Sequence, residues 1–127
     1  MSDQIKHECG LAVVRLLKPL EYYQEKYGTS FYGLQKLHLL LQKQRNRGQD
    51  GAGMATIKLD AKPGEKYISV KRSNSSNYLQ DLFEGVFGHF KDLSHEQASD
   101  PVWLKANMPF MGELLLGHLR YGPHGDA

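Results

Sequence analysis

The sequence has a single cysteine, no long apolar run and almost no net charge. One cysteine in 127 residues excludes an internal disulfide, so nothing points to an oxidising compartment. No apolar run approaches the roughly 18 residues of a membrane-spanning helix, and the polar N-terminus lacks the apolar core of a signal peptide. The formal charge of +2 is spread along the chain and does not favour nucleic acid as a partner. We therefore expect a cytoplasmic protein that binds neither membrane nor nucleic acid.

The apolar residues that are present suffice for one domain. They make up 40% of the chain, and charged residues make up 24%, as is ordinary for a globular protein. A chain of 127 residues is long enough for one domain and too short for two ordinary ones. Residues 10–17 form a nearly continuous apolar run, which predicts a buried strand that ends before Pro19.

Helical spacing and turn signals divide the next part of the chain. A short helix is predicted over residues 20–26, and a longer helix follows Ser30, which is a plausible N-cap. The buried face of the longer helix is predicted to comprise Phe31, Leu34, Leu37, His38 and Leu41, widened by Leu39 and Leu40. Two strands at 54–59 and 66–72, separated by a Pro-Gly turn, predict a hairpin.

The last third of the chain is less regular. Residues 78–90 have the spacing of a second amphipathic helix, whereas residues 91–112 show no clear pattern. A buried strand begins at residue 114 and leads into His118, which we interpret as a core histidine that supports the strand. The chain breaks at a glycine-rich turn over 122–125 and stops just beyond it. We expect the chain to be part of a larger protein.

Three segments that carry polar side chains adjoin these apolar elements. Cys9 stands at the head of the first strand, residues 47–53 (RGQDGAG) follow the longer helix, and residues 117–122 (GHLRYG) end the last strand. Taken singly, such a cysteine is usually a small buried hydrophobe, and Arg47 in its glycine-rich loop is typical of a solvated turn. Taken together, the segments indicate a thiol nucleophile with two arginine-bearing loops around it.

In this order, the three segments resemble the class II glutamine amidotransferases, which are N-terminal-nucleophile hydrolases. The RGQDGAG form of the middle segment is most similar to the amidophosphoribosyltransferase branch, which makes phosphoribosylamine in purine synthesis. The resemblance covers residues 9–125 and implies an α+β fold, the four-layer αββα sandwich, of which this chain holds the first part. It further implies that residues 1–8 are a leader or propeptide. Residues 9–127 are then the N-terminal part of an incomplete glutamine amidotransferase type 2 domain.

The resemblance also implies a reaction and assigns residues to it. Cys9, as the first residue of the mature chain, would attack the side-chain amide carbon of glutamine, ammonia would leave, and water would hydrolyse the thioester. The free α-amine would serve as the base, because its ordinary pKa of about 7.7–8.0 lies close to the thiol value of about 8.5. By the resemblance, Cys9 would be the catalytic residue, Arg120 would bind the glutamine α-carboxylate, Tyr121 and His124 would line the pocket, and Arg47 and Gly48 would support the site.

The parent enzyme implied by the resemblance is a glycosyltransferase that passes ammonia to phosphoribosyl diphosphate. That acceptor and its Mg²⁺ would belong to a further domain, and no cofactor or metal is expected in the present segment. Glutamine is the expected substrate, and a homo-oligomer is the expected assembly. The donors of the family's oxyanion hole would lie beyond residue 127. Because losing one such donor costs on the order of 100–1000-fold in rate, this chain alone is expected to be inactive.

Other functions stay open at this stage. The ammonia acceptor would differ if the chain belonged to a glucosamine-phosphate synthase, a glutamate synthase or an asparagine synthetase. A non-catalytic binding protein with the same fold is a further alternative. It is favoured by Pro123, which stands where the family usually has threonine, and by the residues that precede Cys9. The simplest alternative is an unrelated α+β domain with chance matches to the motifs.

Overall fold

A computed structural model describes residues 10–121 of the chain. In chain order, its elements are β1 (Gly10–Arg15), α1 (Leu20–Tyr27), α2 (Tyr32–Gln44), β2 (Gln49–Ile57), β3 (Ile68–Ser73), α3 (Tyr78–Phe87), the 3-10 turn η1 (Gly88–Phe90), α4 (His95–Ala98), α5 (Pro101–Asn107) and β4 (Leu114–Tyr121). The fold of this range is mixed α and β. None of the helices between residues 10 and 121 is both long and apolar enough to cross a membrane.

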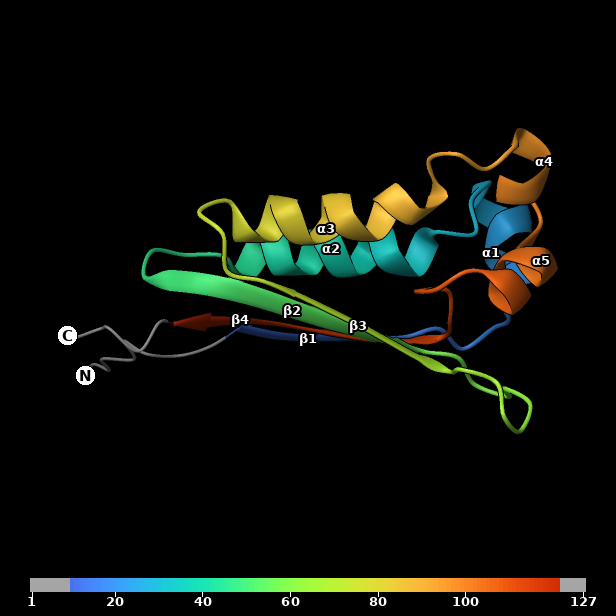
Figure 1. Ribbon diagram of the computed structural model, residues 1–127, viewed down its shortest axis with the longest axis horizontal. Helices are drawn as coiled ribbons and strands as arrows, with labels where there is room; N and C mark the ends of the chain where they lie inside the picture. Colours follow the sequence, from blue (N-terminus) through green and yellow to red (C-terminus); the bar gives the residue numbers. More distant parts are fainter. Residues whose placement is uncertain (1–9, 122–127) are drawn as a thin grey trace.

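The four strands form one antiparallel sheet in the order β1-β4-β2-β3. Strand β4, the last described strand in the sequence, therefore lies between β1 and β2, and the predicted hairpin of β2 and β3 is confirmed. Helices α2 and α3 lie along one face of the sheet, while α1, α4 and α5 gather at one end of the molecule (Figure 1). This topology makes the first and last described strands direct neighbours, although they lie far apart in the sequence.

The hydrophobic core lies between the sheet and helices α2 and α3. Its members come from the faces of β1, β2 and β4 that point to the helices and from the apolar stripes of the helices themselves. The side chains that are completely shielded from solvent include Leu37, Leu41, Leu82, Val86, Leu104 and Leu119. Because α2 and α3 present their predicted apolar faces to this core, both helix predictions are confirmed.

The other face of the sheet is not covered by any element of the described range (Figure 1). In β1, Ala12 and Val14 are buried beneath the helices, whereas Leu11 and Val13 are 69% and 54% exposed. The prediction of a buried strand at 10–17 is thus wrong for half of its residues, because only one face of the sheet is packed. Strands that are apolar on both faces are typical of sheets covered on both sides.

Strand β2 begins earlier in the chain than predicted. Residues 47–53 were expected to form a loop, but Gln49 already pairs with Tyr121, and Gly51 pairs with Arg120. Because β2 is a central strand, it gains hydrogen-bond partners on both edges along most of its length, and this offsets the low strand propensity of its glycines.

The start of α2 also differs from the prediction. Ser30 does not cap the helix, because its hydroxyl donates to Gln24 Oε1 at 2.7 Å. The N-cap residue is Phe31, which has no side chain able to cap, and the preceding Thr29 hydroxyl accepts from the Phe31 N–H at 2.9 Å. Further along, Leu39 is 43% exposed, so it does not widen the buried face.

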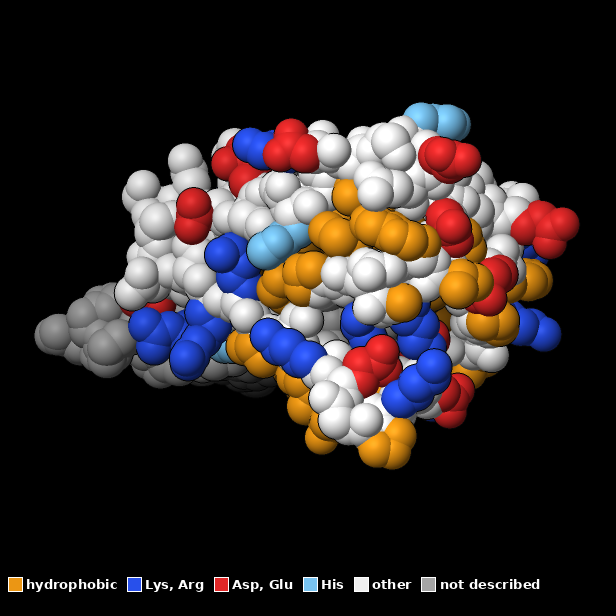
Figure 2. Space-filling view, turned by 45° about the vertical axis from the view of Figure 1, so that its right-hand side comes forward, with side chains coloured by type: hydrophobic (Ala, Val, Ile, Leu, Met, Phe, Trp, Pro, Cys, Tyr) orange, Lys and Arg blue, Asp and Glu red, His pale blue; other side chains and the backbone are white. Residues whose placement is uncertain are grey.

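A shallow groove separates α2 from α3 on the outer surface. His38 of α2 stacks on Phe83 of α3, with ring centroids 4.3 Å apart and an interplanar angle of 18°. Burial in this contact lowers the pKa of His38 below its ordinary value of 6.5. Glu84 and Arg45 line the same groove. The space-filling view shows apolar side chains reaching the surface in the middle of one face, with charged side chains around them (Figure 2).

Candidate functional site

The three motif segments converge at one end of the sheet. Gly10, which follows Cys9 in the chain, is the Cα partner of Leu119, the residue before Arg120. On the other edge of β4, Gln49 of the RGQDGAG segment is the partner of Tyr121. The antiparallel pairing of β4 with both neighbours thus brings together three segments that are distant in the sequence.

Three residues named in the sequence analysis lie outside the described range. They are the predicted nucleophile Cys9, the predicted pocket residue His124, and Pro123 at the position where the family usually has threonine. Their roles therefore stay predictions. The described residues that flank them, Gly10 and Tyr121, belong to paired strands at the same end of the sheet.

Arg120 projects from β4 onto the uncovered face, where its side chain is about half exposed. Its Nε lies 3.6 Å from Oδ1 of Asp50, which forms an ion pair longer than a hydrogen bond. That carboxylate oxygen accepts no hydrogen bond from the residues in the described range. A guanidinium has five N–H donors, so this loose pairing leaves donors for the carboxylate of a ligand.

Tyr121 and the turn before β2 support each other. The Tyr121 hydroxyl donates to Asn46 Oδ1 at 2.7 Å. Its ring packs on Gly48, where a Cβ would lie only 2.7 Å from Tyr121 Cε1, and the φ of +94° at Gly48 also favours glycine. Arg47 is exposed in this turn, and its side chain forms no hydrogen bond or ion pair within residues 10–121. Gly48 therefore leaves room for the Tyr121 ring, and the supporting role predicted for it in the site stays a prediction.

The structure adds residues that sequence reasoning missed. His118 was interpreted as a core histidine, but it lies half-buried on the uncovered face, opposite Gly53 of β2. Arg72 of β3 is the partner of Gly53 on the other edge, so it shares this face. The alternation of Val70 and Arg72 in the predicted hairpin was a signal that could have placed Arg72 there. Asp50 gave no such signal, since it lies at a register shift between Gln49 and Gly51.

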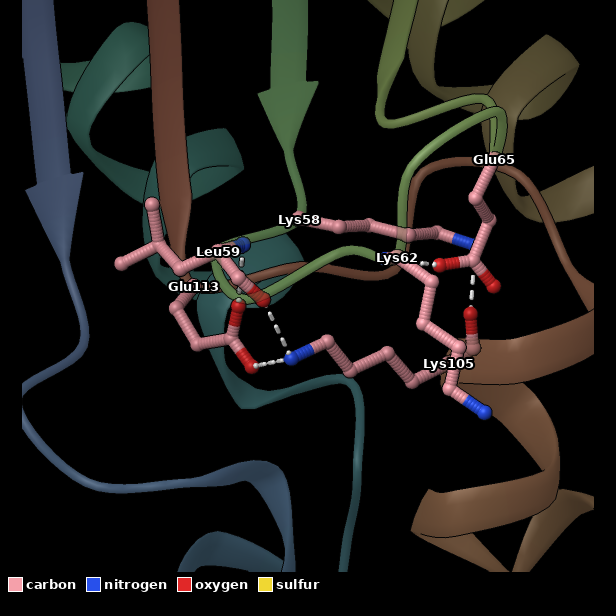
Figure 3. Close-up of polar contacts among 6 residues, drawn as sticks. All are labelled: Lys58, Leu59, Lys62, Glu65, Lys105 and Glu113. Carbon is pink, nitrogen blue, oxygen red and sulfur yellow. Dashed lines mark hydrogen bonds and ion pairs between the residues drawn. The ribbon is translucent and has the colours of Figure 1, made fainter.

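A second polar cluster lies at the opposite end of the sheet (Figure 3). The buried carboxylate of Glu113 accepts from Lys105 Nζ at 2.6 Å and from the Leu59 N–H at 2.9 Å. Lys105 Nζ also donates to the Leu59 carbonyl at 2.8 Å, and Lys58 Nζ donates to the Lys105 carbonyl. Burial lowers the pKa of Lys58. Because these groups satisfy one another, we assign the cluster a structural role that joins α5 to the end of β2.

The arrangement at the arginine end of the sheet suits a small ligand that carries a carboxylate. Among the residues that the structure describes, no group of three or more His, Cys, Asp and Glu side chains is placed to hold a metal ion.

Comparison with protein-family models finds no match for this chain, and comparisons with curated proteins and with solved structures find none either.

Proposed function

We propose that the chain contributes the glutamine-hydrolysing site of a class II amidotransferase, with Cys9 as nucleophile and Arg120 as the residue that binds the substrate carboxylate. The observation that carries this proposal is the convergence of three motif segments at one end of one sheet. A chance occurrence of the motifs gives no reason for residue 10, the turn at 47–48 and Arg120 to meet in space.

In the proposed reaction, the Cys9 thiolate attacks the side-chain amide carbon of glutamine. The nitrogen leaves as ammonia after it takes a proton, and water then hydrolyses the thioester to glutamate. The free α-amine of Cys9 is the base, so residues 1–8 must first be removed; an amide nitrogen in an intact Glu8–Cys9 bond cannot accept the proton. Arg120 holds the α-carboxylate through two parallel hydrogen bonds and so fixes the distance to the reacting carbon.

A second sheet packed on the uncovered face is also part of the proposal. It would complete the four-layer αββα sandwich, with the two sheets about 10 Å apart. The exposed apolar side chains Leu11, Val13 and Val70 support it, since they lie on the same sheet face, on its two edge strands β1 and β3. Their burial would explain why β1 is apolar on both faces.

The identity of the ammonia acceptor rests on the RGQDGAG segment and not on the geometry of the site. By that likeness, the acceptor is phosphoribosyl diphosphate, bound with Mg²⁺ in a further domain of a cytoplasmic homo-oligomer. Other acceptors of class II amidotransferases would use the same glutaminase site, so the test below addresses the site alone.

The proposal is tested by intact mass and N-terminal sequencing of the protein expressed from its complete gene. The expected mature chain begins at Cys9. A glutamine analogue with an electrophilic side chain is then expected to add one covalent label, located at Cys9 by peptide mass spectrometry. Replacement of Cys9 by Ala should abolish the label, and Arg120→Gln should slow labelling about 10-fold or more by weakening carboxylate binding.

Two results would overturn the proposal. The first is a mature protein that retains Met1 or Ser2, together with an unlabelled Cys9. The second is a label that free L-glutamine does not suppress, because a non-specific reaction of an exposed thiol does not need the substrate site. A protein in which Cys9 directly follows the initiator methionine serves as the matched control, since removal of that methionine alone exposes the α-amine.

A further inference from the structure

A cavity of about 420 Å³ opens on the uncovered face of the sheet, beside Arg120. The residues that line it are Ala52, Arg72, Ser73, Asn74, His118 and Arg120. Its volume falls within the range of about 300–1000 Å³ that is usual for small-molecule sites. Two arginines, Arg72 and Arg120, make its lining cationic.

Two glycines of β2 create the space for these side chains. A Cβ at Gly53 would lie 2.6 Å from Nε2 of His118 and 3.2 Å from Cγ of Arg72. A Cβ at Gly51 would lie 3.0 Å from Nε of Arg120. Because Gly51 and Gly53 lack side chains, the long side chains of β4 and β3 can reach over β2 from both sides. The glycines of the RGQDGAG segment thus have a structural purpose that the sequence alone did not show.

The two arginines differ in their pairing. Arg120 has Asp50 at 3.6 Å, whereas the Arg72 side chain has neither an ion pair nor a hydrogen bond with any residue from 10 to 121. The described residues that line this cavity thus include two guanidinium groups and no carboxylate. The excess of positive charge, together with the fork-shaped donors of arginine, suits the two oxygens of a small anion.

We infer that Arg72 is a second anchor for the substrate carboxylate, and that it binds this group from β3 while Arg120 binds it from β4. The inference that the ligand is an amino acid rests on the proposed function, whereas the cationic cavity is observed independently of it. His118 contributes a ring nitrogen to the same cavity. The mature site thus recognises its anion with residues from both neighbours of β2.

Binding is measured by isothermal titration calorimetry on the full chain carrying Cys9→Ala, which prevents turnover. The probes are L-glutamine, L-glutamate and inorganic phosphate. Arg72→Gln is expected to weaken binding of both amino acids about 10- to 100-fold. Arg72→Lys keeps the positive charge but not the paired N–H donors of the guanidinium, and it should weaken binding by a smaller factor. Arg15→Gln is the matched control, because Arg15 is an exposed arginine on the same sheet face at the far end, opposite Leu114. It should leave binding unchanged.

The outcomes separate this inference from the proposed function. Equal binding of glutamine by wild type and Arg72→Gln, or no binding of either amino acid, overturns the inference, even if the glutamine analogue labels Cys9. Binding of phosphate in preference to both amino acids overturns the assignment of a carboxylate ligand. If Arg72→Gln loses glutamine binding while the analogue fails to label Cys9 in the protein that retains it, the inference is upheld and the proposed function is overturned. Circular dichroism of each variant checks that the substitution leaves the overall secondary structure unchanged.

Discussion

His38 is expected to make stability depend on pH, because the folded state disfavours its charged form. Its ring stacks on Phe83, and burial lowers its pKa below 6.5. Between the lowered pKa and 6.5 the unfolded chain binds more protons than the folded chain, so stability rises with pH in this window. The contribution is complete above about pH 6.5 and is lost as the pH falls below that value.

The change that tests this prediction is His38→Phe, which keeps an aromatic ring on Phe83. Urea unfolding at a series of pH values from about 8 to 5 should give a flatter stability profile for the variant than for wild type. His95→Gln, at an exposed histidine in α4, is the control and should keep the wild-type profile. Parallel profiles for wild type and His38→Phe would show that protonation of this ring does not oppose folding.

Individual residues of the site could be predicted from the sequence where successive side chains of a strand point regularly to opposite faces of the sheet. The period of two in the last strand puts Arg120 on the face opposite to Leu119, and the structure places it on the uncovered face. His118 obeys the same alternation, but its partial exposure could not be foreseen, because the sequence does not show which sheet face is covered. Asp50 could not be placed either, since the register shift beside it breaks the period of two on which such reasoning depends.

The polar cluster around Glu113 joins separate elements, so its removal should loosen α5 from the sheet. Glu113→Ala leaves the Lys105 ammonium without its ion-pair partner and the Leu59 N–H without its acceptor. The glutamate side chain is 8% exposed and that of Lys105 is 28% exposed, so partial solvation moderates the loss. We expect the free energy of unfolding to fall by about 2–3 kcal/mol, below the usual cost of breaking a fully buried pair.

Two comparisons make that prediction specific. Glu113→Gln keeps an acceptor for the Leu59 N–H and should cost roughly half as much. Glu65→Ala removes an exposed carboxylate that accepts from the Lys62 N–H and attracts the Lys58 ammonium across solvent, and it should cost less than about 1 kcal/mol. Urea unfolding gives the three values, and amide exchange in α5 shows whether the loss is local. Equal costs for Glu113→Ala and Glu65→Ala would contradict the role assigned to the cluster.

The periodicity of apolar residues predicted the helices and strands, but the residues at which they begin and end depend on contacts with other elements. Helix α2 has the apolar spacing that predicts it, and its buried Leu34, Leu37 and Leu41 meet the sheet. The start of β2 was missed because glycine-rich sequence normally indicates a loop. Residues 52 and 53 pair with both β3 and β4, whereas the hydrogen bonds that make residues 49–51 a strand come from β4. That neighbour comes from the far end of the sequence, and no local pattern reports it.

For the molecule as a whole, the uncovered sheet face is the feature with the largest expected consequence. Leu11, Val13 and Val70 expose more than half of their surface on that face. Contiguous exposed apolar surface of this kind favours association, and β3 and β1 are edge strands that add unpaired backbone groups. We therefore expect the 127-residue chain to associate in solution as its concentration rises.

Sedimentation velocity over a series of protein concentrations tests this expectation. The double variant Val13→Lys/Val70→Lys should stay monomeric at concentrations where wild type associates, because a lysine on a sheet face opposes burial against a second apolar surface. Val102→Lys is the matched control: Val102 is 62% exposed on α5, away from the sheet, and its replacement should leave association unchanged. A wild-type chain that remains a compact monomer throughout would mean that the apolar face does not drive association. It would also remove a main support for a second sheet packed on that face.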